Sequence, residues 1–360
     1  MLNNNLYYNS SANSDPVKAL DFFLKAIKFK SLYILGAGAS YRYIYPNYKI
    51  YDDLDKVLGY SIYDLPLRLT KLEEQDLSRY KVLGSPHTIL EDKAGNLYFE
   101  NLNATVSDYL KHSYPILLEM AAALSYTLPH DVKKCPEYQI LNLTNTKSLF
   151  VSLNHDGLIN TFLHQRKANI INLHGYLSKI EREILTSNLL DIIFYEIRPS
   201  FLDKLWLATK ENDSEIVKKN EYKKFIDKLD NNLYNNILII GYSFFFQFNQ
   251  IQDITTYERL LRYIQQHHSQ VYVIDTEPEK IVEILLQSTN KIDVQCYKVN
   301  WDIFTRAFFS TFQNRTTSWF RITPADIKYF LNCYYYYMDE GCNVEPKIYI
   351  PAMCSKSYSK

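Results

Sequence analysis

Residues 31–40 read Ser-Leu-Tyr-Ile-Leu-Gly-Ala-Gly-Ala-Ser, and this stretch decides the fold. Its first five residues form a short, mostly apolar run that is typical of a buried parallel strand, and the glycines after it indicate a tight turn. Helical patterns lie between further runs of this kind, notably at 254–267 and 278–287. The alternation predicts an α/β fold with a doubly wound parallel sheet. The other runs, the last of them weaker, are 149–153, 168–173, 236–240, 270–274 and 292–299.

Composition divides the chain into three parts. The first is a polar leader followed by a helix, which Asp15 can cap with Pro16 in its first turn. The second is the main domain, and within it lies a stretch with much Leu and Tyr but few strand-like runs, which favours a largely helical insertion. The third is a helical C-terminal extension. Their expected bounds are 1–30, 31–300 with the insertion at about 41–147, and 301–360.

Charge and hydropathy exclude several classes of protein. Forty basic residues balance forty acidic ones, and a chain of zero net charge lacks the field of a dedicated nucleic-acid or anionic-membrane binder. No apolar run approaches the roughly 18 residues of a membrane span. The N-terminal residues also lack the pattern of a secretory signal. We therefore expect a cytoplasmic protein with no membrane contact and no direct nucleic-acid binding.

The five cysteines predict neither a disulfide framework nor a structural metal site. Their number is odd, and their spacing includes no C-x-x-C pair that is typical of a thiolate zinc site. The histidines show no metal-ligand spacing either. We therefore expect no zinc.

Glycine and polar residues gather where the predicted strands end. Gly36, Ala37, Gly38 and Ser40 follow the first strand, in a loop whose N–H groups can meet a phosphate. The loop lacks the third glycine of the dehydrogenase fingerprint and the lysine of a P-loop. A tight turn, as found in any α/β protein, is the alternative interpretation.

Two further strand ends carry candidate chemistry. Asn154 and Asp156 are two residues apart, so in extended backbone they share a face, and an amide beside a carboxylate suits the hydroxyls of a ribose. The alternative is an Asn/Asp turn that bonds its own backbone. His174, followed by Gly175, is suited to be a general base near neutral pH, although a lone histidine is more often structural.

The remaining strand ends carry Gly241 with Ser243, and then Asp275. A small, hydroxylated turn can approach a phosphate or ribose closely, and an acid at the next strand end can accept from ribose hydroxyls. Because ligands of open α/β sheets bind outside the carboxyl ends of the strands, we expect the candidate residues of all these loops to converge on one crevice.

The order of these motifs resembles the sirtuin family. GAGAS, SLNHD, NLHG, GYS and an acid at the next strand end occur here in the order in which similar elements line the NAD pocket of sirtuins. The resemblance covers dispersed elements between about residues 31 and 300. Four short motifs in one order are more specific than any of them alone. The resemblance implies a Rossmann-like domain that binds NAD and cleaves its nicotinamide–ribose bond.

The resemblance also implies roles for the matched residues. Asp275 is matched only by its place at a strand end, where the family usually has Asn. The residues that match the family's catalytic histidine and its nicotinamide and ribose pocket are His174, Asn154 and Asp156. Those that match its cofactor-binding loops are Gly36, Ala37, Gly38, Ser40, Gly241, Ser243 and Asp275.

The chain also departs from protein-deacylating sirtuins. It lacks their four-cysteine zinc module, it carries Leu153 where they usually have Gln, and residues 41–46 replace their Ser-Gly-Ile-Pro-Asp-Phe-Arg-like segment. These departures look like the divergent prokaryotic sirtuin-like proteins of antiphage defence, which hydrolyse NAD to nicotinamide and ADP-ribose. In that group a DNA-translocase-type ATPase or a short Argonaute can be encoded as a separate partner. We accordingly expect an NAD hydrolase that forms a homo-oligomer.

Three alternatives remain open from the sequence. An NAD-dependent protein deacylase or ADP-ribosyltransferase shares every motif above. A non-catalytic subunit that binds NAD or ADP-ribose retains the pocket without the reaction. An unrelated α/β protein can also carry short motifs that coincide by chance.

Overall fold

The computed structural model describes nine stretches of the chain. They are residues 13–40, 134–194, 199–206, 213–242, 246–247, 250–251, 253–287, 292–312 and 322–340. The predicted helical insertion at about 41–147 lies outside the described residues except for 134–147, which form the short helices α9 (Pro136–Gln139) and η4 (Ile140–Leu143) and the approach to the second strand.

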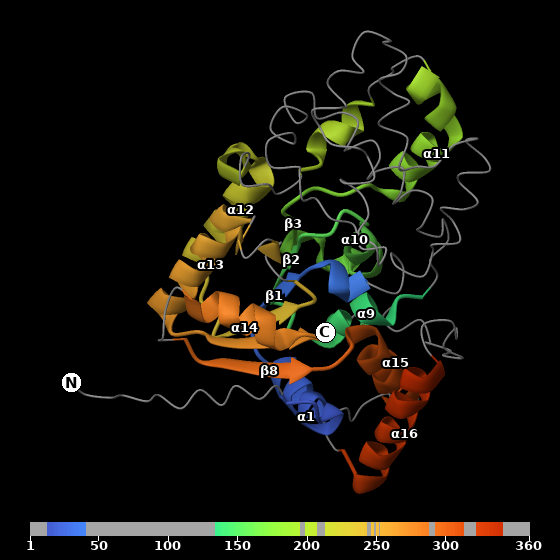
Figure 1. Ribbon diagram of the computed structural model, residues 1–360, viewed down its shortest axis with the longest axis vertical. Helices are drawn as coiled ribbons and strands as arrows, with labels where there is room; N and C mark the ends of the chain where they lie inside the picture. Colours follow the sequence, from blue (N-terminus) through green and yellow to red (C-terminus); the bar gives the residue numbers. More distant parts are fainter. Residues whose placement is uncertain are drawn as a thin grey trace, which may run out of the picture.

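A six-stranded, parallel sheet forms the centre of the molecule (Figure 1). The strands lie in the order β3-β2-β1-β4-β7-β8, which is the order of dinucleotide-binding Rossmann folds when the parallel strands are counted along the chain. All six predicted strands are therefore present, and the predicted α/β class is confirmed. Their bounds are β1 Ser31–Leu35, β2 Leu149–Ser152, β3 Ile170–Asn172, β4 Asn236–Ile240, β7 Gln270–Asp275 and β8 Val294–Lys298; a separate antiparallel pair consists of β5 Phe246–Gln247 and β6 Gln250–Ile251.

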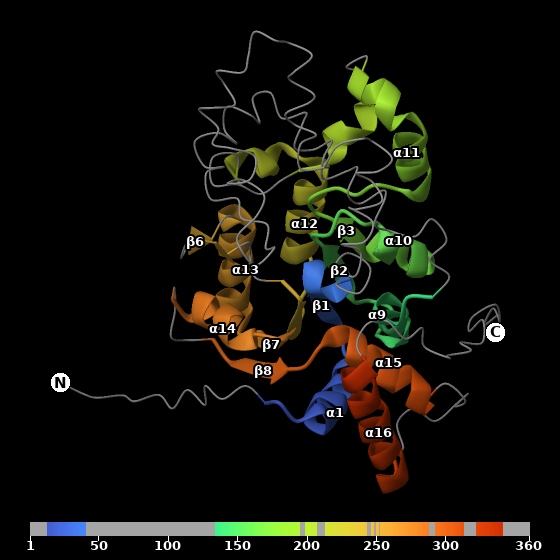
Figure 2. The same cartoon turned by 45° about the vertical axis from the view of Figure 1, so that its right-hand side comes forward.

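Side chains that alternate along each strand enter two separate cores, one on each face of the sheet. From β1, Tyr33 and Leu35 enter the first core, and Leu32 and Ile34 enter the second. Helices on both faces make the sheet doubly wound, as predicted (Figure 2). The first core receives α1 (Pro16–Ala26), α9, α10 (Leu158–Phe162), α15 (Trp301–Phe312) and α16 (Pro324–Glu340). The second receives α12 (Asn220–Asp230), α13 (Ile254–His267) and α14 (Pro278–Gln287).

The remaining helices lie in the connections between these elements. They are η1 (Ala37–Ser40), η5 (His164–Asn169), α11 (Lys179–Phe194), η6 (Ser200–Lys204) and η7 (Asp213–Lys218). Among the residues that the structure describes, no helix is both long enough and apolar enough to cross a membrane.

Helices that pack on the sheet form both ends of the described chain. At the start, the carboxylate of Asp15 accepts from the Val17 N–H at 2.9 Å and Pro16 occupies the first turn, so the predicted cap of α1 is confirmed. At the other end, α15 and α16 form the predicted helical extension, and the rings of Phe304 and Phe330 lie 5.7 Å apart between them. Both helices share a core with the sheet, so they belong to its packing. Residues 341–360 lie outside the described part.

Candidate functional site

The loops after β1 and β4 pack backbone against backbone where the strand order reverses. The Gly38 N–H donates to the Gly241 carbonyl at 2.9 Å. A Cβ on Gly38 would lie 2.7 Å from the Gly241 Cα, and one on Gly241 would lie 2.5 Å from the Ala39 nitrogen. Gly241 also has a φ of 60°, which strains other residues. Glycine is therefore required on both sides of this contact, at the point of the sheet where α/β proteins bind ligands.

These contacts occupy much of the loop that was predicted to meet a phosphate. The N–H groups of Gly36, Gly38 and Ala39 donate to the carbonyls of Ile240, Gly241 and Gly36 at 2.9 to 3.0 Å. Three donors of the predicted phosphate loop thus bond within the protein. The glycines of the loop serve the packing of one strand-end loop on another. Contacts of Gly36, Ala37 and Gly38 with a phosphate stay a prediction.

Asn154 ties the end of β2 to this glycine loop. Its side-chain Nδ2 donates to the Gly36 carbonyl at 2.7 Å and to Ser40 Oγ at 2.9 Å, and it lies 3.0 Å from the Tyr138 hydroxyl. The residue is only 5% exposed. In the described part of the chain no group donates to its Oδ1, so this oxygen is the atom of the side chain that can accept from a ligand. Sequence reasoning missed Tyr138, because nothing near Pro136 signals a long-range contact.

Asp156 reaches the same serine. Ser40 Oγ donates to its Oδ2 at 2.6 Å, so Asn154 and Asp156 turn to one side, as their spacing predicted. The Leu158 N–H donates to its Oδ1 at 2.9 Å, so the alternative of a turn that bonds its own backbone also holds for this residue. Burial raises the pKa of Asp156, and the hydrogen bond from Ser40 opposes that rise.

His174 belongs to a second buried cluster beside the first. Its Nε2 lies 3.2 Å from Asp253 Oδ2, and both side chains are fully buried. The Tyr242 hydroxyl donates to the same carboxylate oxygen. The Trp206 ring packs against the imidazole with 4.7 Å between the ring centroids. A carboxylate on one imidazole nitrogen fixes the orientation of the ring.

Asp253 stands at the N-cap position of α13, yet its side chain makes no capping hydrogen bond. N-capping side chains typically stabilise a helix by about 0.5–2 kcal/mol. The Asp253 carboxylate lacks this interaction and contacts His174 and Tyr242 instead. An Asp directly before a helix is easily interpreted as a cap. For this reason the sequence did not indicate Asp253 as the partner of His174, and only the tertiary structure shows this contact at the sheet edge.

His155 lies between the two clusters. It follows Asn154 in the chain, and its ring centroid lies 6.1 Å from that of His174. Burial, and then the nearby imidazole of His174, lower the pKa of His155 to about 3. His155 is therefore neutral at physiological pH.

The contacts thus join six of the predicted residues, namely Gly36, Gly38, Ser40, Asn154, Asp156 and Gly241. His174 lies in the neighbouring cluster with Asp253. Asp275 ends β7 at the same edge of the sheet, next to Ile274, whose carbonyl accepts from Gly241 at 3.1 Å. Its carboxylate makes local contacts only, among them one from the Glu277 N–H at 2.9 Å, and burial raises its pKa. Ser243 lies outside the described residues.

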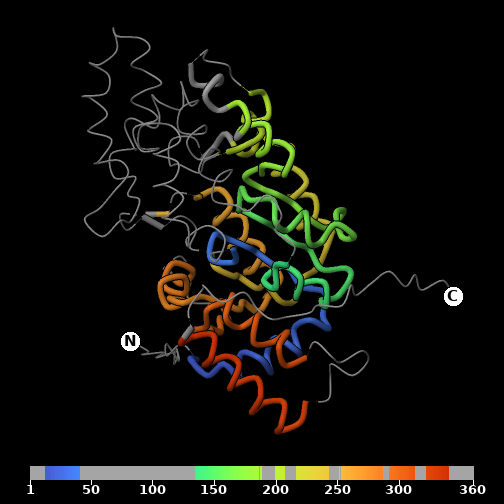
Figure 3. Tube along the Cα trace, turned by 90° about the vertical axis from the view of Figure 1, so that its right-hand side faces the viewer, coloured from blue at the N-terminus to red at the C-terminus, as the bar shows by residue number. Residues whose placement is uncertain are grey.

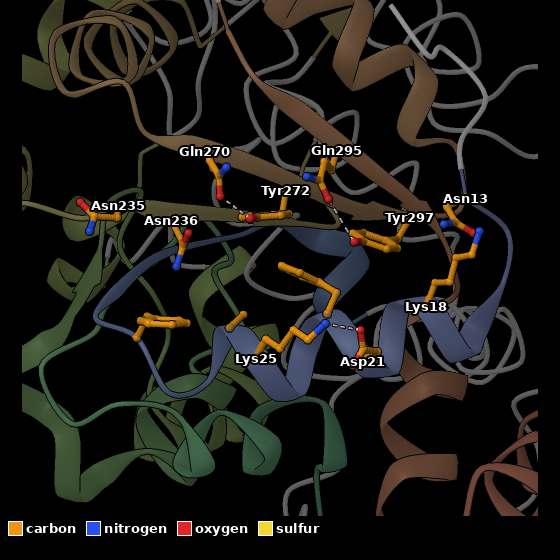
Figure 4. A pocket seen from close by; sticks show the side chains of 13 residues that line it. Asn13, Lys18, Asp21, Lys25, Asn235, Asn236, Gln270, Tyr272, Gln295 and Tyr297 are labelled. Carbon is orange, nitrogen blue, oxygen red and sulfur yellow. Dashed lines mark hydrogen bonds and ion pairs between the residues drawn. The ribbon is translucent and has the colours of Figure 1, made fainter. Parts of the chain in front are cut away.

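A groove of about 600 Å³ lies away from this site, along α1 and the first residues of β4 and β7 (Figure 4). None of the predicted site residues lines it. Several of its polar groups pair with one another: the Tyr272 hydroxyl donates to Gln270 at 2.7 Å, and Lys25 pairs with Asp21 at 2.6 Å. The groove is therefore distinct from the candidate site at the strand ends.

Comparison with known proteins finds no family model that matches the chain, and no curated protein matches it significantly. The resemblance to sirtuins therefore stays a prediction carried by the motifs. Within the described ranges, no three His, Cys, Asp or Glu side chains gather in a way that could hold a metal ion. Cys342 and Cys354 lie outside those ranges.

Proposed function

We propose that this chain is a sirtuin-like NAD hydrolase that cleaves the nicotinamide–ribose bond with water. One observation carries the proposal. Motif residues from the ends of β1, β2 and β4 contact one another through Asn154, Ser40 and Gly241 at the reversal of the strand order, beside a buried histidine–carboxylate pair. This is where Rossmann folds bind dinucleotides, and the motifs occur in the sirtuin order.

The reaction requires a site that stabilises positive charge and guides water. Cleavage of the carbon–nitrogen bond leaves a cationic ribose, and addition of water gives nicotinamide, ADP-ribose and a proton. Asp156 supplies negative charge near the glycine loop, where its contact with Ser40 holds it in place. Asn154 offers its Oδ1 to a ribose hydroxyl or to the attacking water.

His174 accepts the proton in this proposal. A general base needs a fixed orientation, and Asp253 with Tyr242 holds the imidazole from one side. Asp253 is thus proposed as the residue that positions the base, in the way that the aspartate of a catalytic triad orients its histidine. This role does not require Asp253 to touch the substrate.

The burial of both residues supports an enzyme that is latent until it is activated. Asn154 is 5% exposed and His174 is fully buried, whereas a general base must reach water or substrate. We propose that a separately encoded partner, such as a DNA-translocase-type ATPase or a short Argonaute, opens the site in a cytoplasmic homo-oligomer. Activation then depletes NAD in an infected cell.

A non-catalytic NAD-binding or ADP-ribose-binding subunit is the second candidate. It is favoured by the fact that the polar groups of Asn154, Asp156 and the glycine loop bond largely to protein atoms. A deacylase or ADP-ribosyltransferase shares the same residues and differs only in the acceptor that replaces water. The reaction products separate these candidates.

The test is product analysis after incubation of the chain with NAD and the activating partner. We expect nicotinamide and ADP-ribose without any peptide. Asn154→Ala should abolish cleavage, and His174→Ala should slow it by about 10²–10⁴-fold. Asn231→Ala is the matched control, because Asn231 lies at the end of α12, outside the motifs, and its side chain bonds Asp227 at 2.8 Å. Binding of NAD without cleavage would favour the non-catalytic subunit, and O-acyl-ADP-ribose with an acylated peptide would favour the deacylase.

A further inference from the structure

Helix α9 brings a tyrosine into the strand-end site from outside the predicted motifs. The Tyr138 side chain is fully buried, and its hydroxyl lies 3.0 Å from Asn154 Nδ2. In Figures 1 and 3, α9 lies beside the loop that follows β1 and beside α15. The indole N–H of Trp301, the first residue of α15, donates to the Glu137 carbonyl at 3.1 Å. The C-terminal extension thus holds α9, and α9 presents Tyr138 to the site.

The surroundings of Asn154 Nδ2 fix the direction of the side-chain amide. The Gly36 carbonyl, 2.7 Å away, can only accept a hydrogen bond. If the amide were turned over, its Oδ1 would face this carbonyl, and two acceptors would repel each other. The amide nitrogen therefore faces Gly36, Ser40 and Tyr138. This orientation leaves Oδ1 on the other branch of the amide, where it can accept from a ligand.

Proton counting sets the direction of the hydrogen bond between Tyr138 and Ser40. A serine hydroxyl has one proton, and Ser40 donates it to Asp156 at 2.6 Å, because an ionised carboxylate can only accept. The hydroxyls of Tyr138 and Ser40 form a side-chain hydrogen bond, so Tyr138 must be its donor. Burial, and then the negative charge of Asp156, raise the pKa of Tyr138 well above its usual range, so this hydroxyl keeps the proton that it donates.

The result is a directed chain of hydrogen bonds from Tyr138 through Ser40 to Asp156. Hydrogen bonds in a chain polarise one another, so a hydroxyl that accepts a hydrogen bond becomes a stronger donor. Tyr138 therefore strengthens the bond from Ser40 to the carboxylate and favours its ionised form. Two further groups face Asp156: the Leu158 N–H donates to its Oδ1, and Arg182 from α11 donates to its backbone carbonyl at 2.7 Å. A substitution at Tyr138 leaves both of them in the chain.

We propose that Tyr138 is a positioning residue of the candidate site. It holds the Asn154 amide with Oδ1 towards the ligand, and through Ser40 it keeps Asp156 ionised beside the cationic ribose. The hydroxyl need not touch the substrate. This inference rests on the proposed function, and it adds a residue that neither the motifs nor the resemblance includes.

The pH dependence of NAD cleavage tests the inference with Tyr138→Phe, which keeps the buried ring and removes only the hydroxyl. Without the hydroxyl, Asp156 holds its proton to a higher pH, and one lost hydrogen bond corresponds to an effect of about two- to tenfold. With the activating partner present, we therefore expect the cleavage rate to fall by about two- to tenfold more at about pH 5 than at about pH 8. The turnover number should fall more than KM changes, because the charge of Asp156 acts on the cation that forms during the reaction.

Tyr263→Phe is the matched control. Tyr263 is also buried, and its hydroxyl donates to the Asn232 carbonyl at 2.9 Å and accepts from the Tyr234 N–H at 2.7 Å. These partners precede β4, whereas the candidate site lies beyond the carboxyl ends of the strands. The control variant should lose stability as well, but it should keep the wild-type pH profile of cleavage.

Urea unfolding supplies a readout that does not need NAD cleavage. Tyr138→Phe should lose more stability at about pH 8 than at about pH 5, because the weakened hydrogen bond is the one that holds the carboxylate. This difference should vanish when Asp156→Asn is also present. A wild-type chain that cleaves no NAD would contradict the proposed function, and the unfolding series would still decide the role of Tyr138.

Two results would overturn the inference. One is a Tyr138→Phe variant that cleaves NAD with the wild-type pH profile. The other is a loss of stability that is the same at both pH values, because the hydroxyl would then have no influence on the charge of Asp156.

Discussion

Replacing Ser40 by alanine tests the network that joins the strand ends. The Ser40 hydroxyl is fully buried, donates to Asp156 at 2.6 Å and accepts from Asn154 at 2.9 Å. Its removal leaves a buried carboxylate oxygen without this donor. An unsatisfied buried polar group costs about 1–3 kcal/mol, and a charged one costs more. We therefore expect Ser40→Ala to lower the free energy of unfolding by about 2–4 kcal/mol.

The loss should depend on pH in a defined direction. Burial raises the pKa of Asp156 and the Ser40 bond opposes the rise, so the variant raises this pKa further. A carboxyl group whose pKa is higher in the folded than in the unfolded chain binds its proton more tightly when folded. Its contribution to stability therefore falls as the pH rises through that range. The penalty of Ser40→Ala should be larger at about pH 8 than at about pH 5.

Chemical denaturation of a double-mutant cycle measures the interaction. The cycle compares Ser40→Ala, Asp156→Asn and the double variant at both pH values, and we expect a coupling energy of about 1–3 kcal/mol. Ser269→Ala is the matched control. Ser269 is also buried, but its hydroxyl donates to the neutral carbonyl of Tyr234 at 2.8 Å, so its penalty should not vary with pH.

Two outcomes would contradict the reasoning on Ser40. Additive effects within about 0.5 kcal/mol would mean that the serine and the carboxylate do not interact in solution. A penalty that is the same at both pH values would mean that the charge of Asp156 plays no part.

Four further predictions concern the site and its surroundings. Gly241→Ala should lower the unfolding free energy by about 2–5 kcal/mol, because a Cβ there strains the positive φ and meets the backbone of Gly38; an unchanged melting temperature would refute this. Asp253→Asn should keep the fold but reduce NAD cleavage at least tenfold and shift its pH profile, and wild-type activity with a wild-type profile would remove Asp253 from the mechanism. Because the pKa of the half-buried His155 is lowered to about 3, the wild type should lose stability as the pH falls from about 6.5 towards 3, and His155→Gln should flatten that loss; parallel curves for the two proteins would count against it. The purified chain should hold no stoichiometric zinc by elemental analysis, and zinc held by Cys333 or Cys342 would revive the deacylase alternative.

Local patterns in the sequence were enough to predict the elements of the sheet. A strand that is buried on both faces needs a short apolar run, and Leu32 to Leu35 meet this need without any information about their neighbours. The same holds for α13 and α14, whose apolar residues recur with the helical period, and for the cap that Asp15 provides. Glycine at 36, 38 and 241 was also recognisable, because only a tight or crowded backbone requires it.

Only the tertiary structure decided how these loops meet and what the glycines do. The sequence predicted that the first loop can meet a phosphate, which stays a prediction, and the structure adds that the glycines of this loop let two backbones touch. Only the folded structure identifies the partners of the site residues, which are Tyr138, Tyr242 and Asp253. The physical reason is that periodicity reports which side of an element is buried, but not which distant side chain meets it there. A contact such as that between His174 and Asp253, 79 residues apart, depends on the packing of the whole sheet edge.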